Sequence, residues 1–197
     1  MDHKSINFVL VGVGGQGTIL ASDVLAELGL KLGYDVKKAE VHGMSQRGGS
    51  VISHLRWGEQ VFSPIIPKGE ADVLVAFEKL ESVRFQDLLK PGGLMLINDY
   101  SIEPVTVNTA GIPYPADSYL QEQIAQVTDH AHWIKGIEIA ESLGNARAAN
   151  VVVLGALSAL LDLDPQSCDE VLQIRIPPKY LELNRKAFQA GRDAVNK

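Results

Sequence analysis

The sequence contains almost no cysteine, and this absence excludes several kinds of redox centre. Cys168 is the single cysteine among 197 residues. One thiol cannot form an intramolecular disulfide, and it cannot supply the thiolates of an all-cysteine zinc or iron–sulfur site. If the chain takes part in redox chemistry, we therefore expect another chain to hold the electron carriers.

An excess of positive charge and a long apolar run are missing as well. The formal net charge is -6, which argues against a nucleic-acid-binding surface. The longest apolar run, Val151–Leu161, is interrupted by Gly155 and Ser158 and is too short to span a bilayer. The N-terminus lacks the pattern of a secretory signal peptide. We expect a cytoplasmic protein that binds neither nucleic acid nor membrane.

The residues that are present suit one α/β domain over residues 1–197. Hydrophobic residues make up 46% of the chain, which is ample for a core. Three apolar runs lack polar alternation, as strands buried on both faces do: Phe8–Val11, Val73–Phe77 and Leu94–Ile97. Helical patterns over Thr18–Leu32 and Glu81–Leu89 separate them. This alternation predicts a three-layer, Rossmann-like, mostly parallel sheet with helices on both faces.

An antiparallel portion is expected in the same sheet. Ser50–Trp57 and Gln60–Ser63 flank Gly58-Glu59, and this pattern predicts a β-hairpin. Farther along, Ser118–Val127 is predicted to be a helix and Ala131–Ile134 a short strand. The run Val151–Leu161 is apolar around most of a helix, so it is buried either in the core or against a partner.

A glycine-rich turn follows the first predicted strand. Gly12-Val13-Gly14-Gly15-Gln16-Gly17 satisfies G-x-G-x-x-G, in which glycines let the backbone approach a diphosphate at a helix N-terminus. Glu40 ends a predicted second strand, about where a dinucleotide-binding fold places its ribose-binding carboxylate. This pattern by itself favours an NAD(P)-binding Rossmann protein. The alternative is that the glycines only shape the turn and Glu40 is an ordinary strand-end acid.

A second glycine cluster, Gly43–Gly49, separates two predicted strands. Loops at the carboxyl ends of strands are where open α/β sheets bind ligands, so this loop and the first turn should lie together. His42 and Arg47 taken singly are better explained as a backbone-bonded histidine and a solvated arginine. Together, beside a second glycine turn, they favour a binding surface.

Three further positions carry alternative interpretations. Arg147 and Asn150 share a helix face behind Asn145 and could reach the glycine loops, or they could be a surface arginine and part of a helix start. His130 and His132 permit a metal site, but without other clustered ligands they are better explained as solvated. Glu78 either enters the binding edge or is a helix N-terminal acid.

The ordered motifs resemble those of a known family. Gly12-x-Gly-Gly-Gln-Gly17, Glu40-Val-His-Gly-Met-Ser-Gln-Arg-Gly-Gly-Ser-Val51 and Gly144-Asn-Ala-Arg-Ala-Ala-Asn150 resemble the gamma-type subunits of 2-oxoacid:ferredoxin oxidoreductases, most of all the small subunit of the indolepyruvate branch. Pro64-Ile-Ile-Pro67, Gly69–Val73 and Asn184-x-x-Ala-Phe188 extend the resemblance over nearly the whole chain. A gamma subunit of a pyruvate or 2-oxoglutarate oxidoreductase is the alternative within the family.

The resemblance implies a non-catalytic subunit of a larger enzyme. In such enzymes a large partner subunit holds thiamine diphosphate, Mg2+ and the iron–sulfur clusters, CoA is a cosubstrate, and ferredoxin accepts electrons through the complex. The chain itself is then expected to hold no cofactor and no metal, to supply no catalytic residue and to be inactive alone. The residues expected to face a cofactor or the partner are Gly12, Gly14, Gly15, Gln16, Gly17, Glu40, His42, Gln46, Arg47, Gly48, Gly49, Asn145, Arg147 and Asn150.

Overall fold

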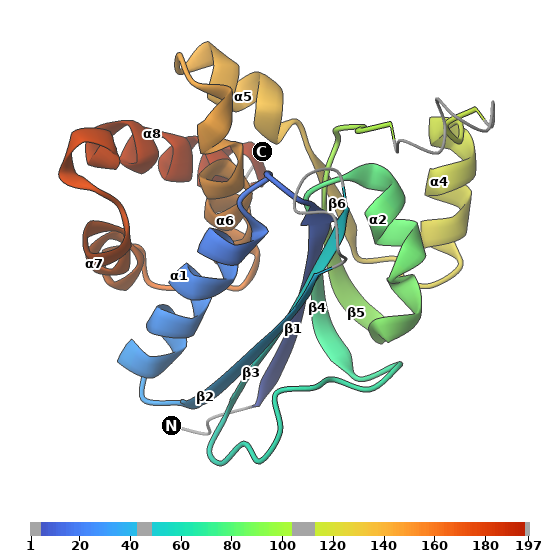
Figure 1. The fold of residues 1–197 in the computed structure, drawn as a ribbon, viewed down its shortest axis with the longest axis horizontal. Coiled ribbons are helices and arrows are strands. Elements are labelled where there is room, and N and C mark those ends of the chain that lie inside the picture. Colours follow the sequence, from blue (N-terminus) through green and yellow to red (C-terminus); the bar gives the residue numbers. More distant parts are fainter. Residues whose placement is uncertain (1–4, 43–48, 104–112, 196–197) are drawn as a thin grey trace.

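A computed structural model describes residues 5–42, 49–103 and 113–195 of the chain (Figure 1). Its strands are β1 (Ile6–Val13), β2 (Asp35–His42), β3 (Ser50–Gly58), β4 (Ala71–Ala76), β5 (Leu89–Asn98) and β6 (Ala131–Ile134). They form one six-stranded sheet in the order β2-β3-β1-β4-β5-β6. β1, β4, β5 and β6 are parallel neighbours, and β3 runs antiparallel to both β1 and β2. The predicted mostly parallel sheet with an antiparallel portion is confirmed.

The predicted partner of β3 is wrong. β3 pairs with β2 from Asp35↔Gly58 to His42↔Val51, and residues 60–63 form no strand. The reason is that β1 occupies the other edge of β3, so no edge remains for a returning hairpin strand. The segment after Gly58 is tied down instead by the Asp35 carboxylate, which accepts a hydrogen bond from the Val61 N–H at 2.8 Å.

Helices cover both faces of the sheet, as the alternating pattern predicts (Figure 1). The longer ones are α1 (Thr18–Lys31), α4 (Asp117–Ala125), α6 (Ala149–Leu160), α7 (Pro165–Arg175) and α8 (Pro178–Val195), and the shorter ones are α2 (Lys79–Arg84) and α5 (Gly136–Ser142). The described residues also contain two single 3-10 turns, η1 (Gln86–Leu88) and η2 (Ala146–Ala148). The helix predicted over Glu81–Leu89 therefore begins earlier and ends at Arg84, because Glu78 caps it and β5 begins at Leu89.

The sheet is buried on both sides because β1 alternates large apolar residues. Phe8 and Leu10 pack into the core under α1 and α6, and Val9 and Val11 pack into the opposite core near α4. All four side chains are completely buried. The apolar run Phe8–Val11 lacks polar alternation because β1 contributes side chains to a core on each face of the sheet.

Helix α6 belongs to the core of this chain. Its residues from Ala149 to Ser158 are all buried, and α8 packs tightly along it. Gly155 of α6 and Gly191 of α8 allow this close approach, since a Cβ at either position would overlap backbone of the other helix. Cys168 of α7 is buried in the same core, and this burial raises the pKa of its thiol to about 11. Among the described helices, none is both long and apolar enough to cross a membrane.

Candidate functional site

The glycine turn connects β1 to α1 and is braced from inside. Gly15 and Gly17 have φ values of 103° and 80°, a left-handed conformation that glycine adopts without strain. The Gln16 side chain accepts a hydrogen bond from the Val13 N–H at 2.8 Å and donates one to the Phe77 carbonyl oxygen at 2.7 Å. Both ends of that amide are therefore used within the protein, and Gln16 supports the turn instead of projecting from it.

The two glycine segments lie together, as predicted from their places at the carboxyl ends of strands. The Gly14 N–H donates to the Gly49 carbonyl oxygen at 2.9 Å. His42 ends β2 opposite Val51, and its side chain is not described. The other candidates of this loop, Gln46, Arg47 and Gly48, lie outside the described residues.

Glu40 does not adjoin the glycine turn as it would in a dinucleotide-binding fold. In that fold the second strand is the neighbour of the first, whereas here β3 lies between β1 and β2. The Glu40 carboxylate accepts a hydrogen bond from Lys38 at 2.7 Å and one from Ser22, in the second turn of α1, at 3.5 Å. This geometry favours an ion-paired strand residue and disfavours the NAD(P)-binding alternative.

The segment Gly144–Asn150 contacts the glycine turn through one residue. Asn150, at the start of α6, is only 5% exposed, and its Nδ2 donates to the Gly17 carbonyl oxygen at 3.3 Å. Asn145 accepts from the Arg147 N–H at 3.0 Å and so caps η2, as its sequence position predicts. The Arg147 side chain is exposed. Together these contacts bring the glycine turn and the start of α6 to one edge of the sheet.

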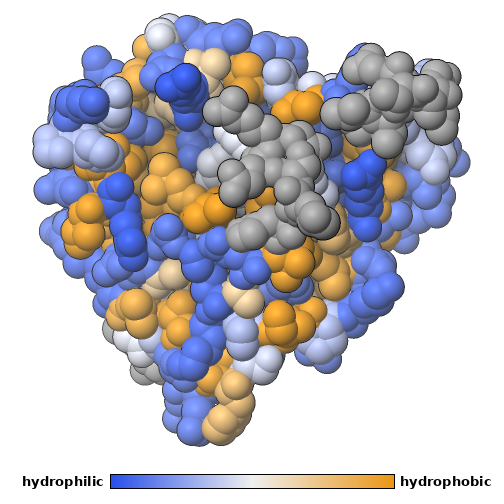
Figure 2. All heavy atoms as spheres, in the orientation of Figure 1, coloured by the Kyte–Doolittle hydropathy of each residue, from blue (hydrophilic) through white to orange (hydrophobic). Residues whose placement is uncertain are grey.

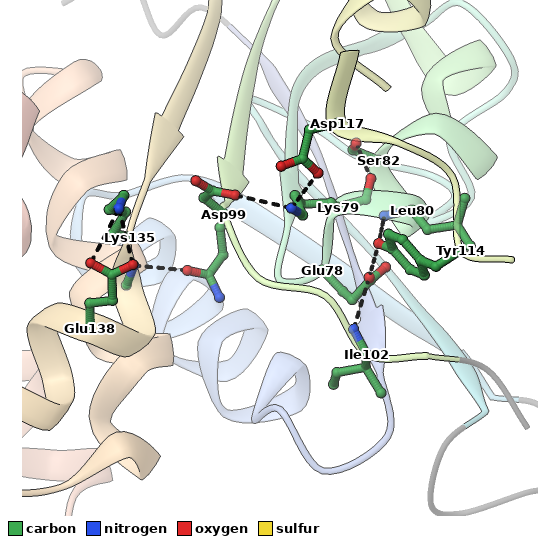
Figure 3. A network of polar contacts seen from close by, with 12 residues as sticks. Glu78, Lys79, Leu80, Ser82, Asp99, Ile102, Tyr114, Asp117, Lys135 and Glu138 are labelled. Carbon is green, nitrogen blue, oxygen red and sulfur yellow. Dashed lines mark hydrogen bonds and ion pairs between the residues drawn. The ribbon is translucent and has the colours of Figure 1, made fainter. Parts of the chain in front are cut away.

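A buried polar network lies at the same edge and was identified from the sequence only in part (Figure 3). Glu78, 1% exposed, accepts hydrogen bonds from the Ile102 N–H at 3.1 Å and from the Tyr114 hydroxyl. Its other oxygen accepts from the Glu81 N–H at 3.0 Å, so it is the helix N-terminal acid that the sequence allowed. Burial and then the hydrogen bond to Glu78 raise the pKa of Tyr114.

Lys79 pairs with two acids in this network. Its ammonium group lies 2.6 Å from the Asp117 carboxylate and 3.3 Å from that of Asp99 (Figure 3). Glu78 and Lys79 thus join the end of β5 to the start of α4. Glu78 was singled out from the sequence, and Lys79 was not. The signal that could have revealed Lys79 is its place next to Glu78, just after the buried strand β4, at the carboxyl edge of the sheet.

Glu81 connects the network to the second glycine segment. It is 2% exposed, accepts a hydrogen bond from the Ser50 hydroxyl, and pairs with Arg84 at 3.0 Å. Burial is the main cause that raises the pKa of Glu81, with Glu78 adding to it and Ser50 and Arg84 opposing it. The carboxyl group therefore positions Ser50, the residue after Gly49, against α2.

Glu81→Gln is expected to flatten the pH dependence of stability. Burial makes the folded protein bind this proton more tightly than the unfolded chain does. The contribution of Glu81 to stability is therefore fully present below the ordinary pKa near 4.5 and is lost as pH rises through the raised pKa of the folded state. Urea unfolding between pH 4 and pH 8 measures this, with exposed Glu122→Gln as the control. An unchanged slope in Glu81→Gln would contradict the assignment.

Comparison with known proteins assigns the family. The model of the family described as pyruvate ferredoxin/flavodoxin oxidoreductase matches residues 7–194. The chain belongs to that family. It is 39% identical to the indolepyruvate oxidoreductase subunit IorB of Thermococcus kodakarensis, over 95% of both chains. It is 38% identical to the protein of the same name from Pyrococcus horikoshii, again over 95% of both.

Solved structures share the fold of this oxidoreductase family. The gamma subunit of a keto/oxoacid ferredoxin oxidoreductase from Geobacter sulfurreducens matches with a TM-score of 0.71 and 25% identity, covering 97% of this chain and 98% of that one. The 2-oxoglutarate:ferredoxin oxidoreductase of Magnetococcus marinus matches with a TM-score of 0.74, but this chain covers only 32% of that one. The same fold thus occurs both as a separate subunit and within a longer oxidoreductase chain.

Metal cofactors of the kind associated with such enzymes require several clustered donor side chains. Within the described ranges, no three His, Cys, Asp or Glu side chains gather as a metal site requires. The sole thiol, Cys168, is buried in the core that contains residues of α1, α6 and α8. That a partner holds the iron–sulfur clusters and Mg2+ stays a prediction.

Proposed function

We propose that this chain is the small, non-catalytic subunit of a thiamine-diphosphate-dependent indolepyruvate, or arylpyruvate, ferredoxin oxidoreductase of the cytoplasm. The observation that carries the proposal is similarity over 95% of both chains to two indolepyruvate oxidoreductase subunits. A 2-oxoglutarate synthase subunit from Methanothermobacter marburgensis is less similar, at 29% identity over 94% of both chains. This ranking favours an aromatic 2-oxoacid over 2-oxoglutarate.

The proposed complex divides its chemistry between chains. The large subunit would hold thiamine diphosphate, Mg2+ and iron–sulfur clusters, which supply decarboxylation of the 2-oxoacid and single-electron transfer to ferredoxin. CoA would accept the acyl group. This chain would contribute a rigid surface that completes or covers the partner's site. Its buried single cysteine and braced glycine turn suit a structural part of this kind.

The surface that we propose to face the partner is the edge carrying Gly12–Gly17, Gly49 and Asn150. Gly15 is exposed there, and Ile19 in the first turn of α1 leaves 43% of its surface in water. Apolar side chains on the face in Figure 2 form small patches separated by hydrophilic ones. A docking site at the glycine edge would therefore depend on shape complementarity to the partner and on a few apolar contacts, as many protein interfaces do.

The proposed function predicts activity only in the assembled complex. We would recover the chain with its partners from anaerobically grown cells and assay arylpyruvate- and CoA-dependent dye reduction. Co-elution of a brown, thiamine-containing large subunit with this activity is the expected result, and other 2-oxoacids then define the substrate. A chain recovered alone, or one that oxidises arylpyruvate without a partner, would contradict the proposal.

A pair of variants locates the docking edge. Ile19→Glu is expected to reduce recovery of the large subunit at least severalfold, because it places a charge in the proposed interface. Leu30→Lys alters a residue that is 56% exposed at the other end of the same helix and should leave recovery unchanged. Each charge suits its end of the helix dipole, so neither should unfold α1. Equal recovery with both variants would remove this edge from the interface.

A further inference from the structure

A hollow lies at the end of the sheet opposite the glycine turn, where β1 begins and β3 ends. Figure 1 shows the segment between β3 and β4 looping past this end of the sheet, close to the N-terminus. The volume of the hollow is about 940 Å³, and it is lined by Ser5, Asn7 and residues 56–63. Pockets that bind small organic molecules usually have roughly 300–1,000 Å³. The hollow can therefore take a small molecule, and it shares no residue with the glycine edge.

Arg56 is held in a fixed position in the wall of this hollow. Its Nε donates to the Asn7 Oδ1 at 2.9 Å, and its Nη1 donates to the Ser63 carbonyl oxygen at 3.3 Å. Asn7 is held in turn, because its Nδ2 donates to the Glu70 carbonyl oxygen at 2.9 Å. Two of the five N–H groups of a guanidinium are used in this way, so the others are left for a ligand. Both acceptors of Arg56 are neutral.

The charge of Arg56 is not balanced by a carboxylate. The side chain is half-buried, and no acidic residue in the described ranges forms an ion pair with it. Its neighbours across the sheet are Asn7 on β1 and Lys37 on β2. Lys37 itself pairs with Asp35 at 2.6 Å. Glu59 is the one acid among the described lining residues, and it is exposed. A partly desolvated cation without a counter-ion attracts an anion.

An aromatic ring stands beside this cation. Phe62 also lines the hollow, 87% of its surface is exposed, and it directly precedes Ser63, the residue that Arg56 contacts. Val61 and Trp57 contribute to the same lining but are themselves buried. The ring of Phe62 therefore has an open surface on which a second ring can pack. A molecule that joins a negative group to an aromatic ring can use both features at once.

We propose that this hollow binds a small aromatic carboxylate, with the carboxylate on Arg56 and the ring against Phe62. The N–H groups left on Nη1 and Nη2 can donate to both oxygens of one carboxylate. Two aromatic rings then pack in an offset or edge-to-face arrangement. The site belongs to this chain alone and lies at the other end of the sheet from the proposed docking edge. It does not depend on the proposed function.

The first test titrates the full-length chain with phenylacetate while amide NMR signals are recorded. Saturable shifts are expected at Ser5 and in residues 56–63, and none at the glycine turn. Acetate lacks the ring and 2-phenylethanol lacks the charge. Acetate should bind roughly threefold more weakly or worse, and 2-phenylethanol roughly tenfold more weakly or worse. This comparison separates a two-part site from a surface that takes up any anion or any apolar molecule.

The second test uses variants of the two proposed ligands. Arg56→Gln is expected to weaken phenylacetate binding roughly tenfold or more, and Phe62→Ala roughly threefold. Because Phe62 is so exposed, its variant should fold normally and report on binding even if Arg56→Gln loosens the segment after β3. Tyr119→Ala removes a half-exposed ring from α4, and Lys135→Gln removes an exposed cation after β6. Both controls should bind phenylacetate normally.

Four results would overturn the inference. They are no saturable shift at millimolar phenylacetate, shifts confined to other parts of the chain, equal binding of 2-phenylethanol, and normal binding by both Arg56→Gln and Phe62→Ala. A purely structural Arg56 would give the first of these. The titrations use this chain without a partner and measure no activity, so the proposed function can stand while this inference falls.

Discussion

Gly191→Ala is expected to destabilise the protein strongly, although alanine normally favours a helix. In an exposed helix the change from glycine to alanine stabilises by about 0.5–1 kcal/mol. Here the new Cβ would lie 2.8 Å from the carbonyl carbon of Val152 and 2.9 Å from the amide nitrogen of Ala156. Both are backbone atoms of α6, which is buried against the sheet, so neither helix can move away without opening the core.

The expected loss is about 1–3 kcal/mol, the usual cost of overpacking. In a protein of this size such a loss lowers Tm by roughly 2–12 °C. Gly155→Ala should behave alike, since its Cβ would lie 2.8 Å from the carbonyl carbon of Phe188. Thermal unfolding measures both, with exposed Gln189→Ala on α8 as the control. Labelling of buried Cys168 by a thiol reagent should also accelerate. Unchanged Tm in both glycine variants would show that the two helices are not in this close contact.

Gly17→Ala is the second change with a large expected effect, because two costs fall on one residue. The φ of 80° is left-handed, and an alanine there costs about 1–2 kcal/mol. Its Cβ would also lie 3.0 Å from the Cγ of Asn150, whose side chain is buried. We expect a loss of about 2–4 kcal/mol in unfolding free energy and reduced recovery of the large subunit.

Gly15→Ala separates the two costs. Gly15 has a φ of 103° but nothing within 4 Å of its Cβ, so its variant carries backbone strain without the steric overlap. Adding Asn150→Ala to Gly17→Ala should recover part of the loss, while adding it to Gly15→Ala should not. Additive losses in both pairs, measured by urea unfolding, would show that Asn150 does not pack on the turn.

The sequence pattern predicted the strands and helices correctly where the spacing of apolar residues matches their burial in the structure. Apolar runs without alternation marked β1, β4 and β5, and the helical spacing with Gly33 beyond it marked α1, which ends at Lys31. The partner of β3 was mispredicted because Gly58-Glu59 is a strong local turn signal. The pairing of β3 depends instead on β1 and β2, which lie earlier in the sequence, outside this signal. β1 and β2 pair with the two edges of β3, so no edge is left for residues 60–63.

The sequence by itself determined the family, the buried parallel strands and the position of both glycine segments, because these depend on the order of residue types along the chain. Only the tertiary structure decided which candidates touch. It placed Gly14 against Gly49 and Asn150 against Gly17, separated Glu40 from the turn by one strand, and turned Gln16 inward. The physical reason is that strand order and helix packing bring together residues that are far apart in the sequence, from 61 positions for Gln16 and Phe77 to 133 for Gly17 and Asn150, and no local pattern encodes those contacts.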